Sequence, residues 1–98
     1  MSTIEDEFRE AGVMRGGVLL LRPNDAIRMV QRSREQRILV LGLDGFVVTD
    51  STTQPILEES IDLSNLINCP NTTCWEIAEQ FLNDRQSSDL FFEVVIDE

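Results

Sequence analysis

Acidic side chains are the most abundant groups in this sequence that could do chemistry, with eighteen Asp and Glu in 98 residues. They cluster at Glu58, Glu59 and Asp62 and again at Glu76 and Glu79, where they could bind a divalent cation or form an acid–base pair. Adjacent strand residues point to opposite faces, so Glu58 and Glu59 cannot bind one ion together. Glu76 and Glu79 share a helix face, but the sequence has no histidine and no glycine-bearing calcium loop. We therefore expect no metal site and no cofactor.

The usual partners of a catalytic nucleophile are also missing. The sequence has no histidine, lysine or tyrosine, which removes the commonest bases and the Schiff-base amine. Cys69 and Cys74 have no imidazole to stabilise a thiolate, and Cys74 falls on a predicted apolar helix stripe. Both thiols are expected to be reduced. These features predict a protein that is not an enzyme.

The segment LVLGLDGFVVTDS resembles the first motif of the haloacid dehalogenase-type phosphatases, a strand followed by Asp-x-Asp-Gly. That resemblance implies a nucleophilic first Asp and a second Asp that acts as general acid and base. Gly42 stands at the nucleophile position, and the sequence has no lysine for the phosphate site. Asp-Gly is also a signal for a two-residue hairpin turn. We therefore expect a hairpin at Asp44 and Gly45, and no phosphatase.

Charge is distributed unevenly along the chain. The net charge of −10 repels nucleic acid and anionic membranes. Residues 1–37 carry seven of the eight arginines and six acidic residues, whereas residues 38–98 carry twelve acidic residues and Arg85 alone. This asymmetry predicts an acidic face for a basic protein partner, although the same acids could serve solubility alone.

The sequence shows no signal for secretion or membrane insertion. The opening segment MSTIEDEFRE is acidic where a signal peptide would be basic. The apolar run over residues 38–43 is far shorter than the roughly 20 residues of a membrane span. We expect a cytoplasmic protein without a nucleic-acid or membrane partner, either a monomer or a weak homo-oligomer.

Apolar periodicity predicts the elements that position these side chains. Helices are expected over residues 3–11, over residues 25–36 with Asn24 or Asp25 as N-cap, and from a capping box at Thr73 and Glu76; strands are expected over residues 18–21, 38–43, 46–49, 56–63 and 90–96. In strand 56–63, Leu57 is expected to point inward, and Glu59 breaks the alternation. The order predicts one α+β domain over residues 1–98, with a small mixed or antiparallel sheet of four to five strands and two or three helices mainly on one side.

Trp75, the only tryptophan, permits two interpretations. It either packs the preceding loop onto the core or serves as a partly exposed aromatic anchor among acids. Together with the outward-facing acids, the second interpretation gives a candidate partner-binding set: Asp44, Asp50, Glu58, Asp62, Trp75, Glu76 and Glu79. The helix that carries Arg28, Arg32 and Arg34 is the next candidate interface.

The segments TTQPILEESIDLS, CWEIAEQFL and LFFEVVIDE resemble small acidic immunity proteins of bacterial polymorphic toxin systems, over about residues 37–98. The likeness is one of layout: a glycine-bearing strand pair, an acidic strand after Gln-Pro, a Trp-bearing helix and a terminal Phe-Glu-Val-Val strand. It implies an inhibitor that binds a cognate toxin, often a nuclease, by presenting carboxylates where the toxin expects phosphates. The alternative is an adaptor or regulatory subunit that could be homo-oligomeric, with Phe91 and Val95 as a subunit contact.

Overall fold

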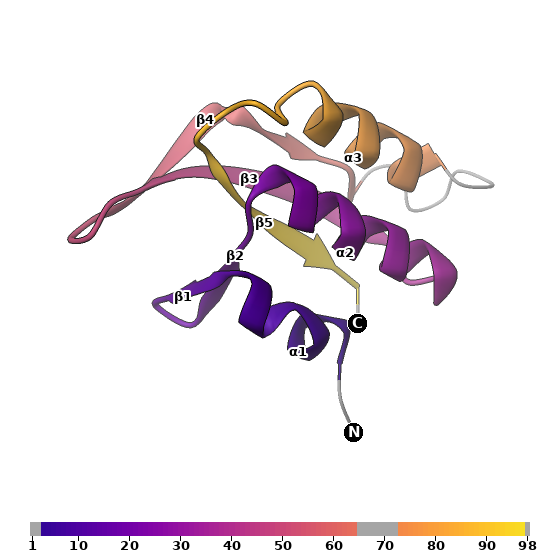
Figure 1. Ribbon diagram of the computed structural model, residues 1–98. Coiled ribbons are helices and arrows are strands. Elements are labelled where there is room, and N and C mark those ends of the chain that lie inside the picture. The colour runs from indigo at the N-terminus through magenta and orange to yellow at the C-terminus, as the bar shows by residue number, and fades with distance from the viewer. Residues whose placement is uncertain (1–2, 65–72, 98) are drawn as a thin grey trace.

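The computed structural model describes residues 3–64 and 73–97 and shows an α+β fold, which confirms the predicted class (Figure 1). The elements are α1 (Ile4–Phe8), the 3-10 helix η1 (Arg9–Ala11), β1 (Val13–Arg15), β2 (Val18–Leu20), α2 (Pro23–Glu35), β3 (Val40–Val48), β4 (Thr53–Asp62), α3 (Thr73–Asn83) and β5 (Phe91–Ile96). Cys69 and most of the segment expected to form a loop before Trp75 lie outside the described residues.

The strands form two antiparallel sheets, so the prediction of one sheet of four to five strands is wrong. One sheet has the order β4-β3-β5, and β1 and β2 form a separate hairpin. One bridge links the sheets: the Leu21 N–H donates to the Phe92 carbonyl at 2.8 Å, and the Phe92 N–H donates to the Leu21 carbonyl at 2.7 Å. Pairing does not continue after Leu21 because Pro23 begins α2. Before Leu21, Leu19 and Val94 line a pocket between β2 and β5.

The first helix is confirmed, although it ends in a 3-10 turn. Thr3 caps α1, and its side chain accepts a hydrogen bond from the Asp6 backbone. Gly16 and Gly17, with φ of 58° and 82°, form the turn between β1 and β2 because these angles favour glycine. Strand β1 had no sequence prediction, since its three residues are too few to show a period.

Helix α2 begins two residues earlier than predicted. Arg22 occupies the N-cap position and Pro23 the first turn, where a missing N–H costs nothing. The Asn24 or Asp25 cap is therefore wrong. The Arg22 guanidinium instead donates to the carbonyls of Ser88 and Asp89, at 3.2 and 3.3 Å, which fastens the start of α2 to the start of β5.

Strand β3 runs without interruption through Asp44 and Gly45, so the hairpin predicted there is wrong. The chain turns later, where the Thr49 N–H donates to the Thr52 carbonyl at 2.9 Å. Among the described residues, positive φ angles occur at Gly16, Gly17 and Arg37, and not at Gly45. The predicted strands 38–43 and 46–49 are one strand, and it pairs with β4 and β5 on its two sides.

Gly45 is required because β4 approaches β3 closely at that point. Strand β4 pairs Ile61 with Leu43 but Ile56 with Gly45, so four β4 residues bulge between these pairs. Within the bulge, Ser60 Oγ accepts the Gly45 N–H at 3.3 Å and donates to the Ile56 carbonyl at 3.1 Å. A Cβ at Gly45 would lie 2.6 Å from the Glu59 carbonyl oxygen.

The bulge also explains why buried and exposed side chains do not alternate along β4 as predicted. Leu57, expected to point inward, is 86% exposed. Glu59, the residue that did not fit, forms an ion pair with Arg85 beyond the end of α3. Arg85 stacks over the Phe81 ring with its guanidinium carbon 3.7 Å from the centroid, so the bulge is joined to the helical layer.

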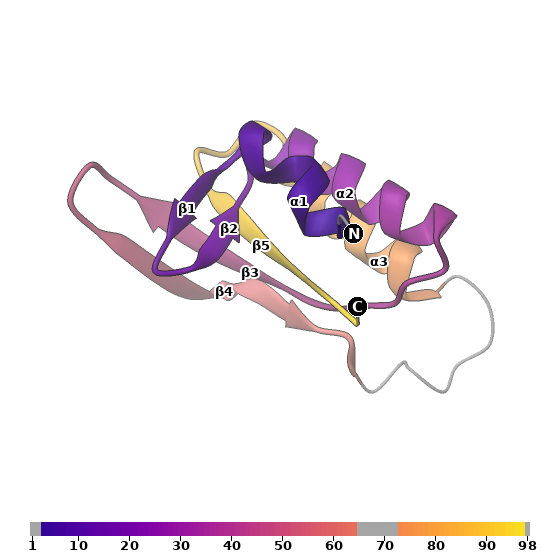
Figure 2. The ribbon, with the colours of Figure 1, turned by 90° about the horizontal axis from the view of Figure 1, so that it is seen from below.

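The helices lie on one side of the three-stranded sheet (Figure 2). Their buried side chains, among them Val30 of α2 and Ala78 of α3, meet Leu43 of β3 and Phe92 of β5 in one core. The opposite face of this sheet carries no described helix (Figure 2). Helix packing therefore leaves one sheet face open to other contacts.

Adding one methyl group at Gly45 tests the close approach of β4. We expect Gly45→Ala to lower the free energy of unfolding by about 3 kcal/mol, the upper range for overpacking, because it meets Glu59 and Phe92. Gly17→Ala has open space around its Cβ and costs only its positive φ, about 1 kcal/mol. Urea unfolding of both variants gives the comparison. Equal losses would show that β4 does not press on Gly45.

Candidate protein-interaction surface

The face of the three-stranded sheet that points away from the helices is the candidate site. Leu43, Phe92 and Val94 are buried in the core beneath the helices. Successive strand residues point to opposite faces, so Asp44 and Glu93 point outward. The six residues of this surface, which we call the open face, are Asp44, Phe46, Asp62, Phe91, Glu93 and Val95.

Strand register sets the geometry of the open face. Asp44 stands directly opposite Glu93, and Phe46 stands directly opposite Phe91 in the next outward pair. Val95 lies beyond Glu93, opposite Gly42. Two carboxylates are thus held side by side between an aromatic pair and an aliphatic side chain. Like charges directly opposite each other destabilise a sheet, so this arrangement works against the stability of the isolated protein.

The two central carboxylates have no counter-charge within the described chain. Neither Asp44 nor Glu93 forms an ion pair with a described residue. Partial burial raises the pKa of Glu93, and the negative charges of Asp44 and Glu5 raise it further. Asp62 behaves differently, because hydrogen bonds from Ser64 lower the pKa of its carboxyl. A cation brought by a partner would relieve the repulsion at Asp44 and Glu93.

Arginines elsewhere in the described chain are largely committed to internal contacts. Arg28 pairs with Asp25 at 3.2 Å, and Arg32 pairs with Glu7 at 3.0 Å and with Glu35 at 3.3 Å. These hydrogen bonds raise the pKa of Arg32 further above its ordinary value. The arginine-bearing helix, the second candidate interface, therefore has two of its three charges balanced within the chain.

One arginine already shows how this surface can receive a cation. The guanidinium carbon of Arg22 lies 5.3 Å from the centroid of the Phe91 ring, within the usual range of a cation–π contact. The same side chain is 3.8 Å from the Asp89 carboxylate. An aromatic ring next to a carboxylate thus holds a guanidinium at the border of the open face.

The structure brings only part of the predicted acidic set together. Asp44 and Asp62 both lie on the open face. Asp44 stands opposite Glu93, whereas Asp62 stands opposite Gly42, two residues away along β3. Asp50 lies in the turn between β3 and β4, and Glu58 lies in the β4 bulge. Glu76 and Glu79 belong to α3, in the helical layer. Strand register and the bulge, which the sequence pattern does not specify, separate these residues.

Trp75 is a core residue, so its interpretation as a partly exposed anchor is wrong. Its side chain is 7% exposed, and its Nε1–H donates to the Ile38 carbonyl at 2.9 Å. Helix α3 packs against both α2 and β3, and its buried side therefore includes Trp75 as well as Ala78. Ile77, which is apolar and stands three residues after Cys74 on the same helix, is 40% exposed.

Four residues of the open face were missing from the predicted set: Phe46, Phe91, Glu93 and Val95. A signal for three of them existed, because residues 91, 93 and 95 form the second face of the alternating strand β5. The sequence could not show that Asp44 would lie next to them, since β3 was predicted to end there. The wrong hairpin prediction therefore prevented the sequence analysis from placing Asp44 next to Glu93.

The described part of the chain offers no candidate metal centre. Residues 3–64 and 73–97 contain no group of three metal-ligating side chains, and Cys74 is a buried free thiol. No helix in these ranges is long and apolar enough to cross a membrane. Searches against protein-family models and against curated proteins gave no match for this chain.

Removing the Glu93 charge tests the repulsion on the open face. Its pKa is raised on folding, so the ionised form is destabilising: the penalty is complete above the raised pKa and vanishes as pH falls through 4.5. We expect Glu93→Gln to increase the free energy of unfolding near pH 7 by about 0.5 kcal/mol, with the gain lost toward about pH 4.

Urea unfolding across this pH range is the measurement, and Glu10→Gln is the matched control because Glu10 is exposed and lies in η1, which is not part of the sheet. The control should change stability less at neutral pH. A Glu93→Gln variant that is less stable than the parent near pH 7 would contradict the account.

Proposed function

We propose that this protein is a non-enzymatic inhibitor of the immunity type, which binds a basic protein partner through the open face. The observation that carries the proposal is the pair Asp44 and Glu93, held directly opposite each other without a described counter-ion. A fold gains nothing in stability from this pair. A partner that inserts Lys or Arg between the two carboxylates would gain charge-assisted hydrogen bonds.

The apolar neighbours make the open face suitable for a protein partner. Phe46, Phe91 and Val95 are only partly buried, so a partner can cover them. Aromatic side chains at the centre of an interface commonly supply much of its binding energy, while charges set specificity and association rate. The open face combines both kinds of group within two strands.

The resemblance of residues 37–98 to immunity proteins supplies the class of partner. A toxin that acts on nucleic acid needs a basic surface for phosphates, and carboxylates on a rigid sheet can occupy that surface. The strong negative charge of the chain would accelerate encounter with such a partner. We therefore propose a cognate toxin domain as the target.

The alternative, an adaptor or subunit that pairs through Phe91 and Val95, is less favourable on electrostatic grounds. Packing two open faces against each other would bring Asp44 and Glu93 of one copy toward the same carboxylates of the other. Burying like charges together is costly unless they are neutralised. Native mass measurement separates these proposals, since a stable homodimer would favour the alternative.

Charge-neutralising variants test the proposed interface with the product of the neighbouring gene as the candidate partner. We expect its association rate with the parent protein to fall steeply between low and physiological salt. Asp44→Asn and Glu93→Gln should each weaken binding about fivefold, corresponding to about 1 kcal/mol. Asp84→Asn, which makes the same charge change at the end of α3, should weaken it less than about twofold.

Stopped-flow mixing gives the association rates, and calorimetry gives the affinities. The proposal would be wrong if a partner bound all three variants with the affinity of the parent. It would also be wrong if binding were insensitive to salt.

A further inference from the structure

Beyond Phe92, the outer edge of β5 has no strand beside it among the described residues. The Phe92 N–H and carbonyl point to this edge, where they pair with Leu21. Backbone groups of alternate residues point the same way, so Val94 and Ile96 present their N–H and C=O groups there as well. Neither has a strand partner among residues 3–64 and 73–97. Unpaired edges of this kind can accept an extended segment from another chain.

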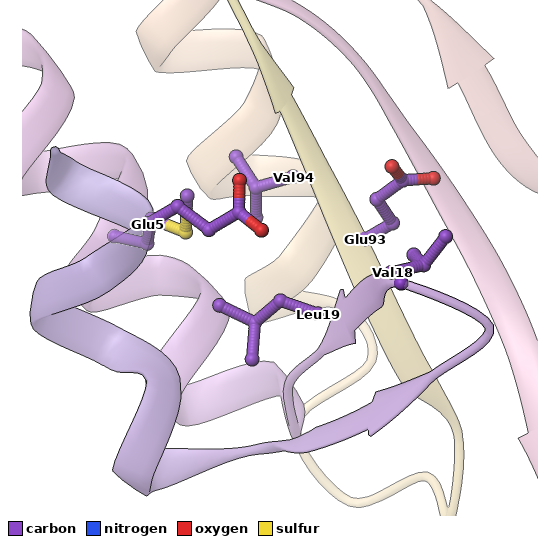
Figure 3. Close-up of a pocket in the computed structure, with 7 residues that line it drawn as sticks. Glu5, Val18, Leu19, Glu93 and Val94 are labelled. Carbon is purple, nitrogen blue, oxygen red and sulfur yellow. The ribbon is translucent and has the colours of Figure 1, made fainter.

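The space next to this edge is a groove between β5 and α1. One pocket of about 110 Å³ is lined by Leu19, Met29 and Val94, with Glu5 at its rim. A neighbouring pocket runs along residues 93–96 and is also lined by Glu5 and Thr3. Figure 3 shows Glu5, Leu19 and Val94 on one side of β5, and Glu93 and Val18 on the other.

The charges around the groove select the occupant. Both pockets contain Glu5 and Glu93, and neither contains a basic side chain among its described lining residues. Glu5 forms no ion pair with a described residue. A segment added to β5 would direct alternate side chains to the Glu5 side and to the Glu93 side. Lys or Arg would find a carboxylate on either side.

We infer that the free edge of β5 binds an extended, lysine- or arginine-bearing segment of a partner protein as an additional β-strand. Hydrogen bonds to Val94 and Ile96 hold its backbone. One long side chain lies over Leu19, Met29 and Val94 and reaches Glu5 with its cationic end. A second copy of this chain is a poorer occupant, because each copy carries a net charge of −10.

This binding mode goes beyond the proposed function, because it uses a strand edge and Glu5, neither of which belongs to the open face, although Glu93 of the open face also lines the groove. It remains valid if the open face proves to have no partner. Conversely, a partner could bind the open face without adding a strand. The experiment therefore includes a variant of each surface.

The probe is the blocked peptide acetyl-KVKVK-amide, and its control is the same peptide methylated at its internal backbone nitrogens. Both peptides carry the same charge, but only the first can donate backbone hydrogen bonds. Nuclear magnetic resonance titration of the full chain gives the affinities. We expect the methylated peptide to bind at least about tenfold more weakly, and the amide hydrogens of Val94 and Ile96 to exchange more slowly with the unmethylated peptide bound.

Three variants locate the contact. Glu5→Gln should weaken binding of the unmethylated peptide about fivefold. Glu10→Gln, in η1 and outside both pockets, and Asp44→Asn, on the open face, should each change it less than about twofold. A fivefold loss in Asp44→Asn together with none in Glu5→Gln would overturn the inference and leave the open face as the binding surface.

Equal binding of the two peptides would overturn strand addition, since charge alone would then explain the affinity. Absence of binding by the unmethylated peptide would overturn it as well. Slow exchange at Val94 and Ile96 without peptide, in a protein that light scattering shows to be a dimer, would assign the edge to a second copy and contradict the inference. The peptide comparison uses the parent protein, so it does not depend on whether a variant folds.

Discussion

The absence of a side chain at Gly45 is the constraint on which the arrangement of the sheet depends. It lets the β4 bulge come close to β3, with the Glu59 carbonyl 2.6 Å from the place that a Cβ would occupy. Glu59 then reaches Arg85, whose guanidinium lies over Phe81, and the Phe81 ring packs edge-on against Phe92 at 6.0 Å. One contact chain therefore joins β4, α3 and β5 across β3. With β3 fixed in this position, Asp44 faces outward and stands opposite Glu93.

The charges of the protein separate into two groups with different roles. Arginines of α2 and acids of α1 and α2 neutralise one another in exposed ion pairs, which contribute little to stability but balance that side of the molecule. Asp44 and Glu93 on the sheet have no such balance among the described residues. Part of the excess negative charge therefore lies where helices do not cover the sheet, which suits a surface that binds a cationic partner.

The sequence predicted the elements with clear periodicity and missed those decided by long-range contacts. The α+β class, the helix over residues 25–36 and the strand over residues 90–96 agree with α2 and β5 to within a few residues. Asp44-Gly45 misled the prediction, because a glycine required by a neighbouring strand looks the same in sequence as a glycine required by a turn. For Trp75 the sequence left two interpretations open, because the side of α3 that is buried depends on packing against α2 as well as the sheet. The open face required the register of β3 and β5, which local patterns do not contain.

Repulsion between Asp44 and Glu93, which no described basic residue balances, is the basis of the proposed binding surface. The most direct measurement is a carbon-detected nuclear magnetic resonance titration of the Glu93 carboxyl in the parent protein and in Asp44→Asn. We expect a Glu93 pKa above the ordinary value of 4.5 in the parent. In Asp44→Asn the pKa should fall toward that value without reaching it, because partial burial, the larger cause, persists. A Glu93 pKa at or below 4.5 in the parent, unchanged by Asp44→Asn, would contradict the claim.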